Sequence, residues 1–326
     1  MSELAVVICT YDNAAMLARV LTALATQTAV GGPWRVLVVK NNSGIDTQRV
    51  LDEHKAKANL PGLRVVDEPT QGLTPARLRG VRESTAPWIA FVDDDCVVDE
   101  HWVEHALAFI DSHPDCGGFG GRVVPTYVEQ PPEVLNDRGW AFAEQDLGDD
   151  VVAVDCLVGA GMVLNRAALE ESGWTTAPFF ADRVGQKLVS GGDVEIALRV
   201  AGTGRSLWYE PGCRLQHIIP VRRTTMPYLL RMTRGLGVSF SLAQTLTWHG
   251  SRSTWAMASF RDAARSLVPV ARSARRALRH ANERQDLALA ASYELGRWVG
   301  MARVAGLMLR GRCVFFGGDR RVVRAR

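Results

Sequence analysis

Three consecutive carboxylates, Asp93, Asp94 and Asp95, directly follow the apolar run at residues 88–92 (WIAFV). Adjacent carboxylates repel one another, and a bound cation relieves that repulsion. In an extended chain the side chains of Asp93 and Asp95 point to the same side, where they can hold a divalent metal together with water and substrate phosphates. The triplet therefore predicts a metal site, and a solvated acidic turn is the alternative interpretation.

A parallel sheet is predicted to carry this triplet. Apolar runs of strand length alternate with segments of helical spacing: strands at residues 4–10, 34–39, 63–66 and 88–92, and helices at 16–24, 46–58 and 75–84. Continuous apolar strands between helices indicate an α/β fold whose parallel sheet is covered on both faces. Because ligands of such sheets bind beyond the carboxyl ends of the strands, we expect loops 10–13, 40–44, 67–79 and 93–95 to share one rim.

The rest of the chain has a different pattern. Residues 117–165 are rich in glycine and contain prolines, which predicts short strands and loops over the sheet edge. Asp193 follows Ser190-Gly191-Gly192 and is expected at the N-terminus of a helix. From Thr225 onward the sequence is helical and rich in alanine and arginine.

Composition narrows the class of protein. The 326 residues are 47% hydrophobic and 22% charged, which excludes disorder as the main state. No apolar run reaches the roughly 18–20 residues of a membrane span, and the N-terminus lacks the basic region of a signal peptide. The six cysteines form no CxxC pair, so we expect buried thiols of a cytosolic protein at Cys9, Cys96, Cys116, Cys156, Cys213 and Cys313.

Charge is divided unevenly along the chain. Residues 1–221 hold 18 basic and 30 acidic side chains, a balance of −12, whereas residues 222–326 hold 20 basic and 5 acidic, a balance of +15. The segment at residues 264–284 (ARSLVPVARSARRALRHANER) interleaves arginine with apolar residues. A basic amphipathic helix of this kind can lie on an anionic membrane surface. No recognition motif supports nucleic-acid binding, and packing of the arginines on the acidic part of the chain is the alternative.

Seven segments occur in an order and spacing that resemble the family 2 glycosyltransferases of the GT-A fold. They are CTYDN (9–13), VVKNNSGID (38–46), QGLTPARLRG (71–80), FVDDDCVVD (91–99), GAGMVLNRAAL (159–169), SGGDVEIALRV (190–200) and LQHIIPVRRTT (215–225). The resemblance covers about residues 4–235. It implies a GT-A domain over 1–224, with a nucleotide-sugar-binding half (1–115) and an acceptor half (116–224), followed by a basic helical region over 225–326.

The resemblance also implies which residues bind the donor and the metal. The strand-end triplet corresponds to the family's DxD motif, which binds Mn²⁺ or Mg²⁺ and the diphosphate of a nucleotide-sugar. The implied metal ligands are Asp93, Asp95 and His217, although a lone histidine is more often structural. The implied donor-binding residues are Thr10, Tyr11, Asp12, Lys40, Asn41, Arg77, Asp93, Asp94 and Arg222. For Arg77 the alternative is a solvated helix arginine, and for Arg222 a part of the basic surface.

Two positions depart from the family pattern. Relatives usually have Asp at the end of the second strand, where it accepts the N3–H of uracil, and this chain has Lys40, which can only donate. Either Asn41 or Asp12 then reads the base, or the donor is not a uridine nucleotide. Gly192 stands where the family usually has Glu. The resemblance leaves Asp193 as the catalytic base, with Glu195 as its rival and a helix N-cap as its structural alternative.

These inferences predict an inverting, metal-dependent hexosyltransferase. It would move a sugar from a nucleotide-sugar to a hydroxyl of a saccharide, lipid-linked or small-molecule acceptor, in the cytoplasm and in peripheral contact with the inner face of the plasma membrane. A sugar-nucleotide pyrophosphorylase is disfavoured because CTYDN is not a Gly-rich phosphate loop. A GT-A scaffold without catalysis is the other alternative, supported by Lys40 and Gly192.

Overall fold

The computed structural model describes residues 3–29, 32–180, 191–279 and 283–310. These residues form two compact units. The first consists mainly of residues 3–128, 139–180 and 192–219, and the second mainly of residues 129–138 and 220–310.

The N-terminal part of the first unit is a parallel α/β arrangement. Its strands and helices alternate in the order β1 (Leu4–Thr10), α1 (Ala14–Ala25), β2 (Trp34–Lys40), α2 (Ile45–Lys57), β3 (Arg64–Asp67), α3 (Leu73–Glu83) and β4 (Trp88–Asp93). The four strands are parallel and lie in the order β3-β2-β1-β4. The predicted α/β order is confirmed, and every predicted element differs from the observed one by only a few residues at its ends.

The following strands continue the same sheet. They are β5 (Cys96–Val98), β6 (Gly118–Tyr127), β7 (Val152–Val154), β8 (Met162–Asn165) and β9 (Leu207–Ile219). The helices of this part are α4 (Trp102–Ser112), α5 (Arg166–Glu171), α6 (Gly192–Ala201) and the short 3₁₀ segment η2 (Gly139–Phe142), while a second 3₁₀ segment, η1 (Glu133–Leu135), belongs to the second unit. The full order is β3-β2-β1-β4-β8-β6-β9-β5, and β7 pairs with β9. The expectation that residues 117–165 only cover the sheet edge is therefore wrong, because β8 and β6 lie inside the sheet.

Both faces of the sheet are buried, which explains why its strands are continuously apolar. Val6 of β1 belongs to the core formed with α1 and α4, and the next residue, Val7, belongs to the core formed with α3, α5 and α6. Successive side chains of a strand point to opposite faces, so each face needs its own apolar set. Gly80 of α3 sits so close to β1 that a Cβ there would lie 2.4 Å from Val7 Cγ1.

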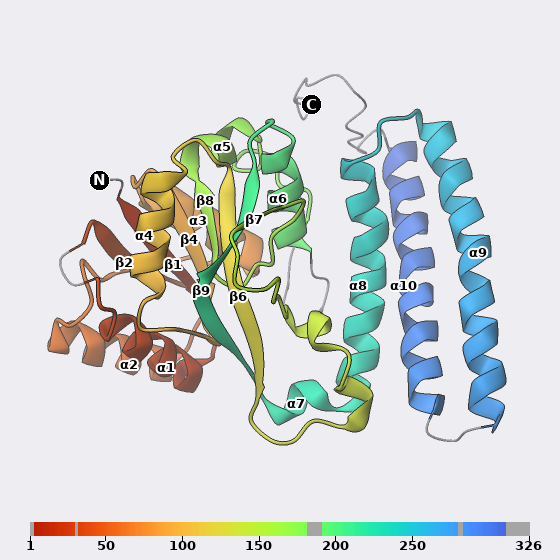
Figure 1. Ribbon diagram of the computed structural model, residues 1–326, viewed down its shortest axis with the longest axis horizontal. Helices are drawn as coiled ribbons and strands as arrows, with labels where there is room; N and C mark the ends of the chain where they lie inside the picture. The colour runs from red at the N-terminus through yellow and green to blue at the C-terminus, as the bar shows by residue number, and fades with distance from the viewer. Residues whose placement is uncertain (1–2, 30–31, 181–190, 280–282, 311–326) are drawn as a thin grey trace. The chain divides into compact units, whose positions relative to one another are not determined.

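The second unit contains α7 (Val221–Thr224) and three long helices, α8 (Met226–Leu246), α9 (Arg252–Arg279) and α10 (Arg284–Leu309). α10 lies between α8 and α9 (Figure 1). The α8–α10 contact is made by small residues: a Cβ on Gly237 would lie 2.1 Å from the Tyr293 carbonyl oxygen, and Ser241 Oγ donates to the Arg297 carbonyl at 2.9 Å. Among the described residues, no helix is both long and apolar enough to span a membrane.

The described cysteines carry free thiols. Cys96, Cys116 and Cys213 are buried as predicted, whereas Cys9 and Cys156 are half-buried. Cys313 lies outside the described residues.

Candidate active site

The carboxyl ends of four parallel strands meet at one rim of the sheet. Thr10 at the end of β1 pairs in register with Lys40 at the end of β2, and Lys40 pairs with Asp67 at the end of β3. On the other side of β1, Cys9 is in register with Asp93, the last residue of β4. The predicted convergence of these loops is therefore confirmed by the strand register.

The three adjacent carboxylates have different partners. β4 ends at Asp93, and the chain turns at Asp94 and Asp95 before β5 begins. The premise that an extended chain aligns Asp93 with Asp95 is therefore wrong. Because the chain turns, each of the three carboxylates contacts different neighbouring side chains. These contacts reduce the repulsion among the carboxylates.

Asp94 ties the ends of β1 and β4 together. Its carboxylate accepts hydrogen bonds from Thr10 Oγ1 at 2.7 Å and from Asn13 Nδ2 at 2.8 Å. Burial raises the pKa of Asp94 to about 7, and the charge of Asp95 adds to this, while the bonds from Asn13 and Thr10 act in the opposite direction. A cation held beside the triplet would favour the charged carboxylate.

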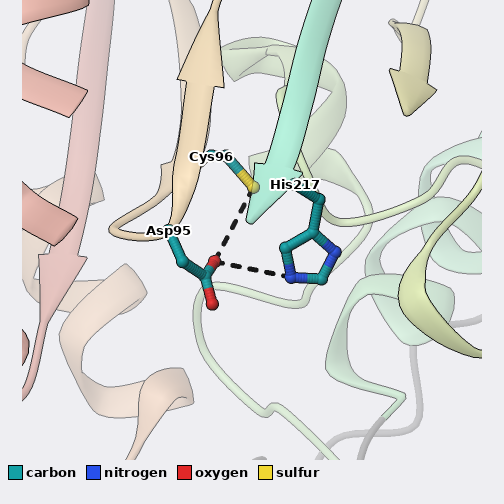
Figure 2. Close-up of side chains that lie close together, drawn as sticks. All are labelled: Asp95, Cys96 and His217. Atoms are coloured by element: carbon teal, nitrogen blue, oxygen red, sulfur yellow. Dashed lines mark hydrogen bonds and ion pairs between the residues drawn. The ribbon is translucent and has the colours of Figure 1, made fainter. Parts of the chain in front are cut away.

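Asp95 and His217 lie together in the interior, next to Cys96. The antiparallel pairing of β5 with β9 places Cys96 opposite His217, and Asp95 immediately precedes β5. Asp95 Oδ1 lies 3.6 Å from His217 Nε2 and 3.8 Å from Cys96 Sγ (Figure 2). Within the described part of the chain, this is the one group of three or more acidic, histidine or cysteine side chains whose ligand atoms all lie within 4.8 Å of one another.

The hydrogen bond on the far side of the ring determines how His217 faces Asp95. Nδ1 lies 2.7 Å from the Phe142 carbonyl oxygen, and a carbonyl can only accept, so Nδ1 carries the hydrogen. In a neutral imidazole, Nε2 then directs its lone pair towards the Asp95 carboxylate. A neutral ring and the carboxylate can share a cation, whereas a protonated ring pairs with Asp95 directly. A backbone carbonyl on the other ring nitrogen is the usual support of a metal-binding histidine. The carboxylate of Asp95 and the Nε2 atom of His217 are ligand atoms that suit a divalent metal.

Arg77 of α3 is buried, with only 3% of its surface exposed. Its guanidinium lies 3.3 Å from Asp93 Oδ1 and 5.3 Å from the centre of the Phe91 ring. The alternative of a solvated helix arginine is therefore wrong. A buried cation at the rim, held by a strand-end carboxylate, is well placed to stabilise an anion there.

Lys40 is paired with a carboxylate that the sequence analysis did not identify. Its ammonium lies 3.0 Å from Asp67 Oδ1 and donates to Gln48 Oε1 at 2.6 Å. Asp67 is the last residue of β3 and its side chain is 76% exposed. The signal in the sequence was its position directly after the predicted strand 63–66. The rim thus keeps a carboxylate, one strand further from β1 than in the family pattern.

Asn41 and Asp12 are engaged in holding the rim loops. Both amide hydrogens of the buried Asn41 are donated to backbone carbonyls, of Glu68 at 2.8 Å and Thr70 at 2.7 Å, and its oxygen accepts from Gly72 N. Asp12 Oδ1 accepts from Gly44 N at 2.7 Å. Base recognition by Asn41 is therefore disfavoured. Tyr11, between these loops, is half exposed.

Asp193 lies inside the first turn of α6, which begins at Gly192. Its Oδ2 accepts from Gly159 N at 3.1 Å and its Oδ1 from Val194 N at 2.9 Å. The N-cap alternative is wrong because the helix already includes Asp193. Gly159 permits this approach, since a Cβ there would lie 2.9 Å from Asp193 Cβ.

Glu195 is fully buried and has a structural role. Its two oxygens accept from Phe179 N at 2.6 Å and Phe180 N at 2.8 Å, and its carboxylate lies 2.9 Å from the Arg199 guanidinium. Burial raises the pKa of Glu195, and Arg199 with the two amides opposes that rise. A carboxylate with no exposed surface does not reach an acceptor, so the burial of Glu195 disfavours it as the base, and the role of Asp193 stays a prediction.

Arg222 lies in α7, which belongs to the second unit, and its side chain is exposed. Its assignment to donor binding stays a prediction. The roles of the other rim residues stay predictions as well, although their positions around one rim agree with them.

Comparison with known proteins identifies the class. Residues 5–173 match the model of Glycosyl transferase family 2. Because the match covers more than half of the chain, the protein belongs to this family, and it is a glycosyltransferase. Its sheet and flanking helices have the GT-A fold.

Particular relatives agree with this assignment. A glucosyl-dolichyl phosphate glucuronosyltransferase of Haloferax volcanii is 24% identical over 70% of this chain and 73% of its own length. A mannosyltransferase of Pyrobaculum calidifontis, solved in complex with GDP-Man and Mn²⁺, superposes with a TM-score of 0.61 at 18% identity over 92% of this chain and 87% of that one. S. aureus TarS 1-349, solved with UDP-GlcNAc, gives a TM-score of 0.50 at 15% identity over 74% and 70%. The two structures show a shared fold.

Proposed function

We propose that the protein is an inverting, metal-dependent glycosyltransferase that moves a hexosyl group from a nucleotide-sugar to a hydroxyl of a saccharide, lipid-linked or small-molecule acceptor. The observation that carries this proposal is the buried pair Asp95 and His217, with Nδ1 of the histidine tied to a carbonyl and Nε2 facing the carboxylate. Mn²⁺ or Mg²⁺ bound there would stabilise the charge that develops on the leaving diphosphate, whereas Asp93, also predicted as a ligand, pairs with Arg77.

The residues around the metal site have separate duties in this proposal. Arg77 supplies a buried positive charge for the diphosphate, next to Asp93. Thr10, Asp94 and Asp12 hold the strand ends that form the nucleotide site. Asp193 takes the proton of the acceptor hydroxyl, and one base is sufficient for inversion because the nucleophile attacks opposite the leaving group.

We assign base recognition to Asp67 together with Lys40. A carboxylate accepts from a ring N–H, and an ammonium donates to the adjacent carbonyl oxygen. Guanine and uracil both present such an N–H beside a carbonyl. The GDP-Man complex of the Pyrobaculum calidifontis enzyme and the UDP-GlcNAc complex of TarS make both bases reasonable probes.

The name of the Haloferax volcanii relative supports a lipid-linked acceptor. Such an acceptor fits peripheral contact of this protein with the inner face of the plasma membrane. The alternative of a GT-A scaffold without catalysis rested on Lys40 and Gly192. The ion pair of Lys40 with Asp67 keeps a carboxylate at the rim, so Lys40 no longer argues for the scaffold. Family membership sets the pyrophosphorylase alternative aside.

Two variants separate binding from chemistry. Asp95→Asn should lose Mn²⁺-dependent binding of GDP and UDP, measured by titration calorimetry, because an amide is a poor metal ligand. Asp193→Asn should keep that binding but lower transfer roughly 10²–10⁴-fold, the usual effect of losing a general base. Slow release of nucleoside diphosphate from GDP-mannose or UDP-GlcNAc, with water in place of the acceptor, reports the chemical step.

The control is Asp111→Asn, which removes the same charge from an exposed position on α4 and should change neither property. Unaltered Mn²⁺ affinity in Asp95→Asn would place the metal elsewhere. Near-normal turnover in Asp193→Asn would assign the base to another residue.

A further inference from the structure

α9 has two different long surfaces. The surface that packs on α10 is made mostly of small buried side chains at helical spacing: Trp255, Ser259, Ala263, Ser266 and Ala277. Because α10 lies between α9 and α8 (Figure 1), only one side of α9 is covered within the three-helix arrangement.

The uncovered side exposes an apolar stripe. Its large members are Met257, Phe260, Leu267, Val268 and Leu278, each at least half exposed, with Phe260 at 78% and Leu278 at 86%. At 100° per residue, the five side chains fall within an arc of about 100°. The exposed residues Ala264 and Ala271 lie within the same arc. Scattered exposed apolar residues are ordinary, but a continuous stripe along four turns or more marks an interaction surface.

A row of arginines runs beside the stripe. Arg261, Arg265, Arg272 and Arg275 are all exposed, and their spacing places them within about 80° of arc, adjacent to the apolar side chains. α9 holds seven arginines and a single acid, Asp262, and this acid pairs with Arg297 of α10. The row therefore has no acidic side chain of α9 to neutralise it.

We propose that this face of α9 lies on the surface of an anionic lipid bilayer. The apolar stripe would enter the boundary between headgroups and acyl chains, and the arginine row would contact lipid phosphates. Arginine suits this position because its apolar stem can follow the stripe while its guanidinium stays at headgroup level. This inference specifies the peripheral membrane contact proposed above, and it requires neither the metal site nor transfer.

Charge disfavours two protein occupants of the same face, a second copy of α9 and the C-terminal residues of the chain. A two-fold contact between two copies of α9 would bring two arginine rows together with no intervening acids, which is unfavourable. Residues 311–326 of the chain contain five arginines and one aspartate, so they do not complement the row either. An anionic bilayer offers both the negative charge and the apolar layer that the face requires.

Vesicle flotation of the full-length protein tests the proposal. Vesicles of phosphatidylcholine alone are compared with vesicles that also contain phosphatidylglycerol, at low and at high salt. One variant replaces Arg261, Arg265 and Arg272 with Gln, and a second carries Phe260→Ser and Leu267→Ser. The control replaces Arg49, Lys55 and Lys57 of α2 with Gln, which removes the same charge from exposed positions in the first unit.

The parent should bind the phosphatidylglycerol vesicles and release them as salt rises. Each basic side chain near an anionic surface contributes roughly five-fold, so the triple arginine variant should bind about 10²-fold more weakly. The apolar variant should also lose binding, and the α2 control should not. Equal losses in the α2 control and the arginine variant would overturn the proposal, and so would an absence of vesicle binding in the parent.

The same variants identify the rival occupant. A dimer of the parent in light scattering that the Phe260→Ser and Leu267→Ser substitutions dissociate would assign the face to a second copy and overturn the lipid proposal. Vesicle binding is measured without donor or Mn²⁺. Its failure would therefore leave the transferase proposal intact, and a failed transferase proposal would leave the vesicle result intact.

Discussion

At the scale of single residues, carboxylate side chains have different roles because their surroundings differ. Asp193 and Glu195 are two residues apart in α6, yet Glu195 is fully buried and accepts two backbone N–H groups, while Asp193 is only partly buried and sits against Gly159. The three carboxylates of the triplet also have different partners. Asp93 pairs with Arg77, Asp94 accepts from Thr10 and Asn13, and Asp95 faces His217. Burial and hydrogen-bond partners, rather than residue type, distinguish the carboxylate proposed as the base from the structural one.

The Lys40–Asp67 pair leads to a prediction about base selectivity. Lys40→Asp alone would place two carboxylates at neighbouring strand ends and should weaken binding of every nucleoside diphosphate. Combining Lys40→Asp with Asp67→Lys restores the ion pair and puts the carboxylate at the end of β2, the position that the family pattern implies for accepting the N3–H of uracil. Since a hydrogen bond to a charged group contributes ~1.5–3 kcal/mol, the double variant should shift the ratio of UDP to GDP affinity towards UDP by at least about 10-fold.

Titration of UDP, GDP, ADP and CDP in the presence of Mn²⁺ measures this shift. The single variant is the control for simple loss of charge balance. If the parent and the double variant rank the four nucleotides identically, Asp67 and Lys40 do not contact the base.

At the scale of elements, glycines determine how closely α8 and α10 approach. A Cβ on Gly296 would lie 2.1 Å from the Arg234 carbonyl oxygen, whereas a Cβ on Gly306 of the same helix meets nothing within 4 Å. Gly296→Ala should destabilise the protein by ~1–3 kcal/mol through overpacking, even though alanine is the better helix former by ~1 kcal/mol.

Gly306→Ala is the matched control and should be neutral or stabilising, because it gains helix propensity without a clash. Denaturant unfolding of the full-length variants gives both free energies. Equal effects at the two positions would contradict close packing of α10 on α8.

At the scale of the whole molecule, burial protects thiols in several parts of the fold. Burial raises the pKa of Cys9 to about 12 and those of Cys116 and Cys156 to about 11, and it raises the pKa of Cys213 well above its ordinary value. At pH 8 a thiol of pKa 11 is ionised about 10²-fold less than one of pKa 9. In a Cys313→Ser variant, these native thiols should react with a disulfide reagent at least that much more slowly than after denaturation.

Each thiolate forms only as the pH approaches its raised pKa, so the native reaction should accelerate steadily from pH 8 to pH 10. Fast, complete labelling of the native Cys313→Ser variant at pH 8 would contradict the raised pKa values of these thiols. Labelling in denaturant provides the reference rate for each thiol.

The α/β class was predictable from the sequence because its signal is local. Apolar runs of strand length alternate with helical spacing over residues 4–93, and a parallel sheet covered on both faces needs that pattern. The rim was predictable for the same reason, since parallel strands bring their carboxyl ends together. The basic, amphipathic character of α9 was also readable, because helical spacing alone places its arginines on one side.

The tertiary structure decided what depends on contacts between distant parts of the chain. The turn at Asp94 separates the carboxylates that an extended chain would align, and the pairing of β5 with β9 brings His217 to Asp95 across 122 positions. Asp67 and Lys40 form an ion pair because strand register places them side by side. The side-chain amide of Asn41 donates both its hydrogens to backbone carbonyls of a later loop, so it is not available to a nucleotide base. Sequence patterns report the periodicity of burial, whereas a site depends on the few ångströms between side chains that only the packed chain determines.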